Sequence, residues 1–200
     1  MRKLSLIAII GLLLFACISP LSAALITQCP AVGLDTGCGI LITVTAISAS
    51  GAATAFTVTA ATAPTQPPFE GAEDTLIGIQ NNATADLKSI ALSSTTDIFG
   101  FDGDGICTVT PHPSGCPFAT TGPGADYAGP GVSFSGISAA GRFGVVNFNP
   151  AVAAGGSTYF GLEEALTPSQ IQPGVPEPGT MALMGTGLGA LLLFVRRKTA

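Results

Sequence analysis

The chain has 200 residues and a formal net charge of −5, and only 10% of its residues are charged. Five of its seven basic residues lie near the two ends, so residues 25–174 hold Lys88 and Arg142 against eleven Asp and Glu residues, a net charge of −9. This balance excludes nucleic acids and charge-held anionic polysaccharides as ligands, because both require a cationic face. Divalent cations and neutral glycans fit such an acidic domain better.

Residues 1–24 have the three parts of an export signal: a positively charged start, an apolar run over residues 4–18, and small residues at 22–24. We therefore predict a signal peptide that signal peptidase removes after residue 24. The alternative is a lipoprotein signal in which Cys17 is acylated, although the bulky Phe15 stands where such signals prefer a small residue. In either case the rest of the chain matures outside the cytoplasm.

Four cysteines remain after residue 24, and they form two pairs with the same spacing. Cys29 and Cys38 are nine positions apart, as are Cys107 and Cys116, and each pair encloses a segment rich in Gly, Pro or Thr. In an oxidising compartment this spacing predicts the disulfides Cys29–Cys38 and Cys107–Cys116. Each short loop should add about 2–3 kcal/mol to the free energy of unfolding.

The region between the two ends is long enough for one domain with a core of its own, which we place at residues 25–170. We predict an all-β fold, because β-branched and partly alternating runs are separated by turn residues and no segment keeps a 3.6-residue apolar period. An antiparallel β-sandwich, immunoglobulin-like or jelly-roll, is the natural packing for such strands. The predicted strands are residues 40–49, 55–60, 75–80, 87–93, 98–101, 132–137, 142–148 and 158–162.

A glycine-rich acidic turn, Asp102-Gly103-Asp104-Gly105, is the best candidate for a ligand site. Hard cations bind such oxygen clusters, so we predict Ca²⁺ at Asp102 and Asp104, with Asp97 and the Glu73-Asp74 pair as possible neighbours in space. At most one of Glu163 and Glu164 would help, because adjacent strand residues point to opposite faces. The alternative is a solvated acidic turn that uses glycine for positive φ.

The sequence offers little for catalysis, and we predict that the protein is not an enzyme. His112 is the only histidine and lies between two prolines. There is no Gly-x-Ser-x-Gly and no His-Glu-x-x-His. A secreted hydrolase that uses two of the acidic residues remains an alternative.

The C-terminal segment, residues 171–200, joins a stiff acidic peptide to an apolar run and a basic end. Residues Val175, Pro176, Glu177, Pro178 and Gly179 are followed by an uncharged stretch and then by Arg196, Arg197 and Lys198. As a helix the sixteen uncharged residues 180–195 would rise about 24 Å, somewhat short of a typical hydrocarbon core of about 30 Å. We predict a marginal transmembrane helix over residues 179–195 whose basic end stays in the cytoplasm, so that the domain lies outside.

These three parts, in this order, resemble the PEP-CTERM sorting signal of Gram-negative envelope proteins. The resemblance implies that an exosortase, a membrane-embedded peptidase, reads the Pro-Glu-Pro of residues 176–178 and releases or transfers the mature protein. It also implies an inner-membrane-anchored precursor, a cell-surface or extracellular destination, and a link to exopolysaccharide and biofilm. The alternative is an ordinary C-terminal membrane anchor with a proline-rich stalk.

A looser resemblance concerns the domain itself. Asn81-Asn82, and residues 149–157 before the predicted strand at 158–162, are similar to turns of bacterial immunoglobulin-like surface domains. This similarity carries no catalytic residue across. We therefore favour a non-enzymatic surface or matrix protein, with a Ca²⁺- or glycan-binding module as the alternative.

Overall fold

A computed structural model describes residues 26–61 and 65–174. The signal peptide predicted at residues 1–24, and the sorting motif, membrane helix and basic end predicted after residue 174, lie outside these residues. Within the described residues, no helix is both long and apolar enough to cross a membrane.

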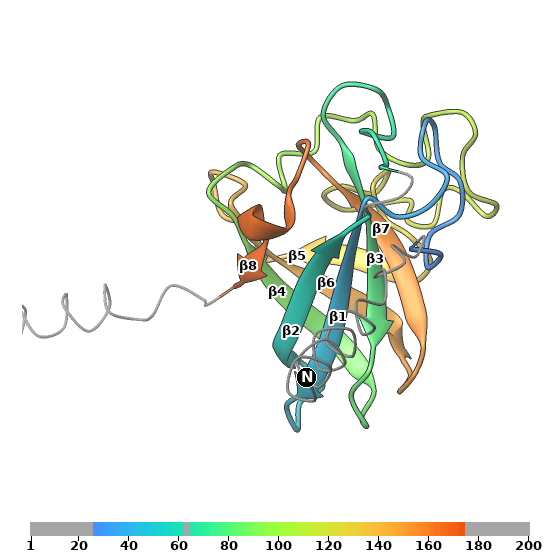
Figure 1. Cartoon of the computed structure of the whole chain (residues 1–200). Coiled ribbons are helices and arrows are strands. Elements are labelled where there is room, and N and C mark those ends of the chain that lie inside the picture. Colours follow the sequence, from blue (N-terminus) through green and yellow to red (C-terminus); the bar gives the residue numbers. More distant parts are fainter. Residues whose placement is uncertain (1–25, 62–64, 175–200) are drawn as a thin grey trace, which may run out of the picture.

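The described chain is all-β and forms two four-stranded sheets that share one apolar core (Figure 1). A short 3₁₀ helix, η1 (Pro168–Gln170), precedes the last strand. The first sheet has the order β2 (Ala53–Ala60), β1 (Ile40–Ile47), β3 (Thr75–Asn81), β7 (Ser157–Leu162). The second sheet has the order β5 (Val132–Ser135), β6 (Phe143–Val152), β4 (Leu87–Ser93), β8 (Gln172–Pro173).

Alternating side chains explain how most strands reach this core. In β1 the residues Ile40, Ile42 and Val44 are buried while their neighbours are partly exposed, which is the pattern of a strand with one face in the core. β3 differs, because nearly all of its residues are buried. The Cys29–Cys38 disulfide covers its second face, and Cys38 Sγ approaches β3 so closely that Gly78 has no room for a Cβ.

The predicted strands agree with the structure at seven places, with ends that differ by a few residues. The strand predicted at 98–101 is wrong, because that segment is a turn. Its apolar side chains fill the core instead: the rings of Phe99 and Phe101 make an edge contact at 5.9 Å, and Phe99 also contacts Phe134 at 6.1 Å. β8 was not predicted, since two residues with one proline give no periodic signal.

The expectation of purely antiparallel sheets needs one correction. β1 and β3 run parallel, with Ile40 opposite Ile77. β2 runs antiparallel to β1 and brings the chain back to the end at which both β1 and β3 begin, which allows the parallel pairing. The two sheets are therefore rich in antiparallel pairs without being entirely antiparallel.

Both predicted disulfides are confirmed. Cys29 is bonded to Cys38, and Cys107 is bonded to Cys116. The long loops of the domain gather at the end where β3 begins and β7 ends, at the top of Figure 1. That end holds the candidate site.

Candidate functional site

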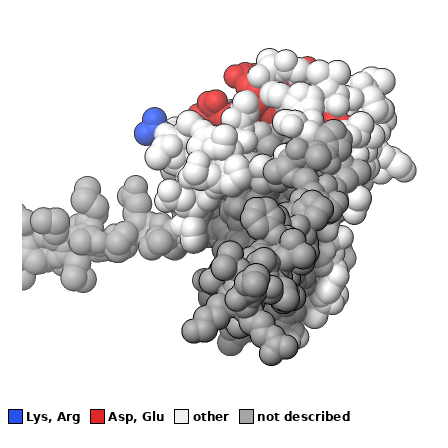
Figure 2. Space-filling model, viewed as in Figure 1, with Lys and Arg blue, Asp and Glu red and all other residues white. Residues whose placement is uncertain are grey.

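Five carboxylates from three separate segments meet at the loop end of the first sheet. They are Glu73 and Asp74 just before β3, Asp102 and Asp104 in the glycine-rich turn, and Glu163 just after β7. One oxygen each from Glu73, Asp102 and Glu163 lie within 4.8 Å of one another, and the same holds for Asp74, Asp104 and Glu163. We call these five residues the acidic cluster. Acidic side chains are visible at this end of the domain in Figure 2.

The register of β3 and β7 places two of these acids opposite each other. Thr75 pairs with Leu162 at the end of the ladder, so Asp74 and Glu163 occupy the next position outward on their two segments. Like charges in facing positions destabilise a sheet. The Thr75 hydroxyl holds the segments together nevertheless: it donates to Glu164 O at 2.8 Å and accepts from the Leu166 N–H at 2.8 Å.

A tight turn orients the acids that precede β3. The Glu70 carboxylate accepts the backbone N–H groups of Ala72 at 2.8 Å and Asp74 at 2.9 Å, and also that of Glu73. Glu70 thus stabilises the turn rather than joining the cluster. The turn leaves Glu73 exposed and directs Asp74 into the protein.

The glycine-rich turn is fixed from below by a tyrosine. Tyr127 is fully buried, and its hydroxyl lies 2.6 Å from Asp104 Oδ1 and 3.2 Å from Asp102 Oδ1. Since one hydroxyl has one proton, its hydrogen bond goes to the nearer oxygen, that of Asp104. Gly103 has a φ of 105°, which favours glycine in this turn.

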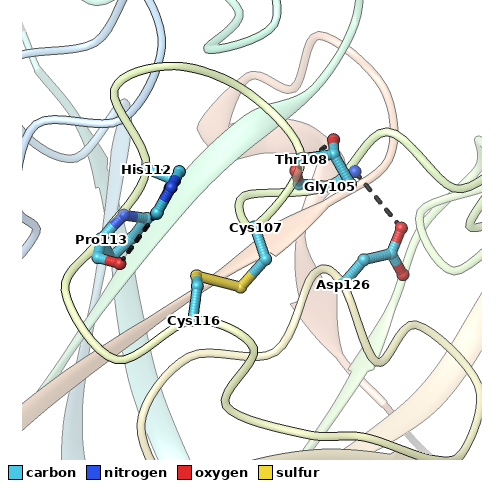
Figure 3. Close-up of a disulfide and its surroundings, with 7 residues drawn as sticks. All are labelled: Gly105, Cys107, Thr108, His112, Pro113, Cys116 and Asp126. Carbon is cyan, nitrogen blue, oxygen red and sulfur yellow. Dashed lines mark hydrogen bonds between the residues drawn. A yellow bond between two sulfur atoms is a disulfide. The ribbon is translucent and has the colours of Figure 1, made fainter.

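Hydrogen bonds to Asp126 anchor the chain that leaves this turn, next to the second disulfide. The Gly105 N–H donates to Asp126 Oδ2 at 3.4 Å, and the Cys107 N–H donates to Asp126 O at 3.1 Å (Figure 3). Gly105 packs so closely on the Asp126 backbone that a Cβ there would lie 2.6 Å from its carbonyl carbon. The segment 102–107 is therefore held next to Tyr127, and Asp104 with it.

Two buried members of the cluster have carboxylate oxygens without a hydrogen-bond partner. Asp74 has 0% of its surface exposed, and neither of its carboxylate oxygens has a partner. Glu163 is 8% exposed, and its Oε2 has none. The only basic residues between positions 25 and 174, Lys88 and Arg142, belong to or adjoin strands of the second sheet. No positive side chain therefore comes from the elements that build the cluster.

Burial and mutual repulsion shift the proton affinities of these acids. Burial raises the pKa of Asp74 to about 9, and the charges of Glu163 and Asp104 add to this effect. Burial likewise raises the pKa of Glu163 to about 7, with the charges of Asp102 and Asp104 contributing. The hydrogen bond from Tyr127 acts in the opposite direction and lowers the pKa of Asp104.

The donor set of the cluster consists of carboxylate oxygens, with no histidine or cysteine among its members. Oxygen-only sets of this kind suit hard cations, whereas zinc sites commonly include imidazole or thiolate ligands. The arrangement therefore offers the chemistry of a site for a hard divalent cation.

Some of the site residues predicted from the sequence lie in the acidic cluster, and others do not. Asp102 and Asp104 lie together, with the Glu73-Asp74 pair and with Glu163, while Glu164 stays outside both sets of ligand atoms. Asp97 does not join them; it packs against the backbone of Gly141. Tyr127 was missed, because it lies in a long loop with no periodic pattern. His112 is exposed, and its Nδ1 lies 3.3 Å from the carbonyl oxygen of the adjacent Pro113 (Figure 3).

A comparison with known families finds a PEP-CTERM protein-sorting motif at residues 174–198. This confirms the resemblance seen in the sequence, and it implies an exported, membrane-anchored precursor that an exosortase processes. No curated protein and no solved structure matches the chain significantly. The likeness of the domain to immunoglobulin-like surface domains is thus not confirmed.

Proposed function

We propose that this protein is a non-enzymatic component of the cell surface or extracellular matrix, exported as a membrane-anchored precursor and cut near the Pro-Glu-Pro of residues 176–178. Its cargo is the acidic β-sandwich that follows the signal peptide and includes β8 (Gln172–Pro173). The observation that carries this proposal is that the sorting motif begins directly after β8, the last strand of the described residues. The motif match starts at Gly174, whose N–H donates to Ala91 O at 2.8 Å, immediately after β8.

This junction suits processing near the motif. All strands of the described domain precede Gly174, so a cut between Pro176 and Gly179 leaves each of them intact. Gly179 lies five positions after Gly174, and even fully extended this stretch spans no more than about 18 Å. Before the cut, the edge of the second sheet at β8 would therefore lie close to the membrane.

The two disulfides support a destination outside the cytoplasm, and the charge of the domain bears on its neighbours there. Both disulfides are of a kind that forms and persists in oxidising compartments. The net charge of −9 over residues 25–174 favours neutral over anionic polysaccharide as a neighbour in the matrix. We accordingly propose an association with exopolysaccharide and biofilm that does not depend on attraction between opposite charges.

The processing step can be tested on the protein that cells release. Intact-mass and C-terminal peptide analysis should find a new C-terminus between Pro176 and Gly179. The variant Glu177→Gln should remain cell-associated at full length, whereas Glu164→Gln, an acid of the folded domain, should be processed normally. Recovery of residues Arg196 to Ala200 in the extracellular form would contradict the proposal.

The matrix association needs a separate measurement. The released protein should co-sediment with exopolysaccharide from the same cells, and added salt should not detach it, because the interaction is not ionic. A protein that stays fully soluble in the presence of this polysaccharide would overturn the association and leave the sorting step unaffected.

A further inference from the structure

We propose that the acidic cluster is a Ca²⁺ site that joins three segments of the exported domain. This inference goes beyond sorting and matrix association, and it does not depend on either. Its innermost ligands are Asp74, Asp104 and Glu163, whose oxygens lie within 4.8 Å of one another. Glu73 and Asp102, which form the second set with Glu163, lie on the exposed side of the same cluster.

The unpartnered oxygens of Asp74 are the observation that separates this cluster from an ordinary acidic surface. A surface carboxylate is hydrated, but Asp74 has 0% of its surface exposed and neither of its oxygens has a hydrogen-bond partner. Protonation would remove the charge of Asp74 and let it donate to a neighbouring carboxylate, but it would still leave the second oxygen of Asp74 without a donor. A bound cation would engage Asp74 together with the equally orphaned Glu163 Oε2.

The oxygen ligands and their burial favour calcium over magnesium. Ca²⁺ binds oxygens at about 2.3–2.6 Å, so two ligands on opposite sides of the ion lie up to about 5 Å apart. The ligand atoms of each set fall within that limit, at 4.8 Å or less. Mg²⁺ requires contacts of about 2.0–2.1 Å and usually retains several waters, which a residue as buried as Asp74 does not accommodate.

The surrounding contacts show how the protein prepares these ligands. Glu70 holds the turn that presents Asp74, and the Tyr127 hydroxyl holds Asp104 at 2.6 Å. The β3–β7 ladder sets Asp74 opposite Glu163. A cation at this point would connect the start of β3, the 102–105 turn and the end of β7, so binding would stabilise the loop end of the domain as one unit.

The test uses the full-length chain, exported so that its disulfides form, purified in detergent and treated with EGTA. Added CaCl₂ should bind in isothermal titration calorimetry and raise the melting temperature, and MgCl₂ at the same concentration should do much less. The variants Asp74→Asn and Glu163→Gln should lose most of the Ca²⁺-dependent shift. Asp86→Asn, which changes an exposed acid outside the cluster, should keep it.

The behaviour of Asp74→Asn in EGTA separates a ligand from a structural residue. If Asp74 is a ligand, the asparagine variant should melt close to wild type in EGTA and fall below it only when Ca²⁺ is added, because asparagine keeps the shape of the side chain and loses the carboxylate that binds the ion. A variant that is less stable than wild type to the same extent with and without Ca²⁺ would show a structural role and overturn the proposal. So would a wild-type protein whose melting temperature is unchanged by millimolar CaCl₂.

Terbium luminescence gives a second test that does not require a stable ligand variant. Tb³⁺ replaces Ca²⁺ in oxygen sites, and a nearby tyrosine sensitises its emission. The chain has no tryptophan and two tyrosines, and Tyr127 lies next to the proposed ligands. Emission should appear on Tb³⁺ addition, compete with Ca²⁺ and disappear in Tyr127→Phe. Emission that survives in Tyr127→Phe and is lost in Tyr159→Phe would place the ion elsewhere.

Discussion

Asp74 and Glu163 stand opposite each other one position beyond the Thr75–Leu162 pair that ends the β3–β7 ladder. The strand register brings these two acids together, and the Thr75 hydroxyl ties the segments on either side. Two facing carboxylates at the end of a ladder would separate if the loops around them were free. Here the Glu70 turn and the packing on Tyr127 keep them in place.

Replacement of Tyr127 by phenylalanine should destabilise the domain. The change removes the hydroxyl that donates to Asp104 at 2.6 Å and leaves the aromatic ring in the core. Because a hydrogen bond to a charged group contributes about 1.5–3 kcal/mol, we expect a loss near the lower end of that range for a partly exposed acceptor. Urea unfolding in EGTA measures it. Tyr159→Phe is the matched control, since no hydrogen bond of its hydroxyl is found in the described structure, and an equal loss in both variants would contradict the prediction.

The stability of the domain should depend on pH through Asp35. This residue lies in the Cys29–Cys38 loop with 1% of its surface exposed, and burial raises its pKa from 3.8 to about 7. The folded state therefore retains a proton that the unfolded chain releases, so the contribution of Asp35 to stability is present below about pH 4 and is lost as the pH rises through about 7.

Asp35→Asn should remove this dependence. The variant should be more stable than wild type at pH 8 and close to it at pH 4, in melting curves recorded at matched ionic strength. The exposed Asp86→Asn provides the comparison. A constant difference between Asp35→Asn and wild type across the pH range would show that Asp35 does not titrate on unfolding.

The two disulfides should differ in how readily they are reduced. Cys29 and Cys38 are buried, with 6% and 0% of their surface exposed, whereas Cys107 and Cys116 are both partly exposed. Mild dithiothreitol followed by alkylation and peptide mass spectrometry should label Cys107 and Cys116 first. Simultaneous labelling of all four cysteines would mean that reduction requires global unfolding.

Calcium should slow hydrogen exchange at the loop end and leave the opposite hairpin unchanged. We expect protection in residues 73–75, 102–105 and 161–164, because the proposed ion joins these segments. The turn between β1 and β2, residues 48–52, should exchange equally with and without Ca²⁺, since it is far from the cluster along the chain and lies at the other end of β1 (Figure 1). Equal exchange everywhere would argue against Ca²⁺ binding.

Sequence patterns identified the strands whose buried and exposed residues alternate. They failed where apolar residues are buried in a turn and where a strand is defined only by its pairing partner. Phe99 and Phe101 form an apolar run that looks like a strand, yet they fill the core from a turn, and only their ring contacts reveal this. β8 follows from pairing with β4 through Leu92 and Ser93 rather than from its own residues.

The acidic cluster was half visible in the sequence. The glycine-rich turn marked Asp102 and Asp104, because local spacing is enough to recognise carboxylates on one turn. That Asp74 faces Glu163 depends on which strands pair and in what register, and nothing local to residues 74 or 163 encodes that pairing. The position of Tyr127 beside Asp104 depends on the path of a long loop, so no rule of sequence spacing could have predicted it.

β8 also determines where a mechanical load would enter the domain. Any tension on the C-terminal segment passes through Gly174 to a strand of two residues, which pairs only with the outer part of β4. Such a short attachment peels away before the longer ladders are strained. The precursor could therefore yield at this edge, lengthening its tether, while the acidic end and both disulfide loops keep their shape.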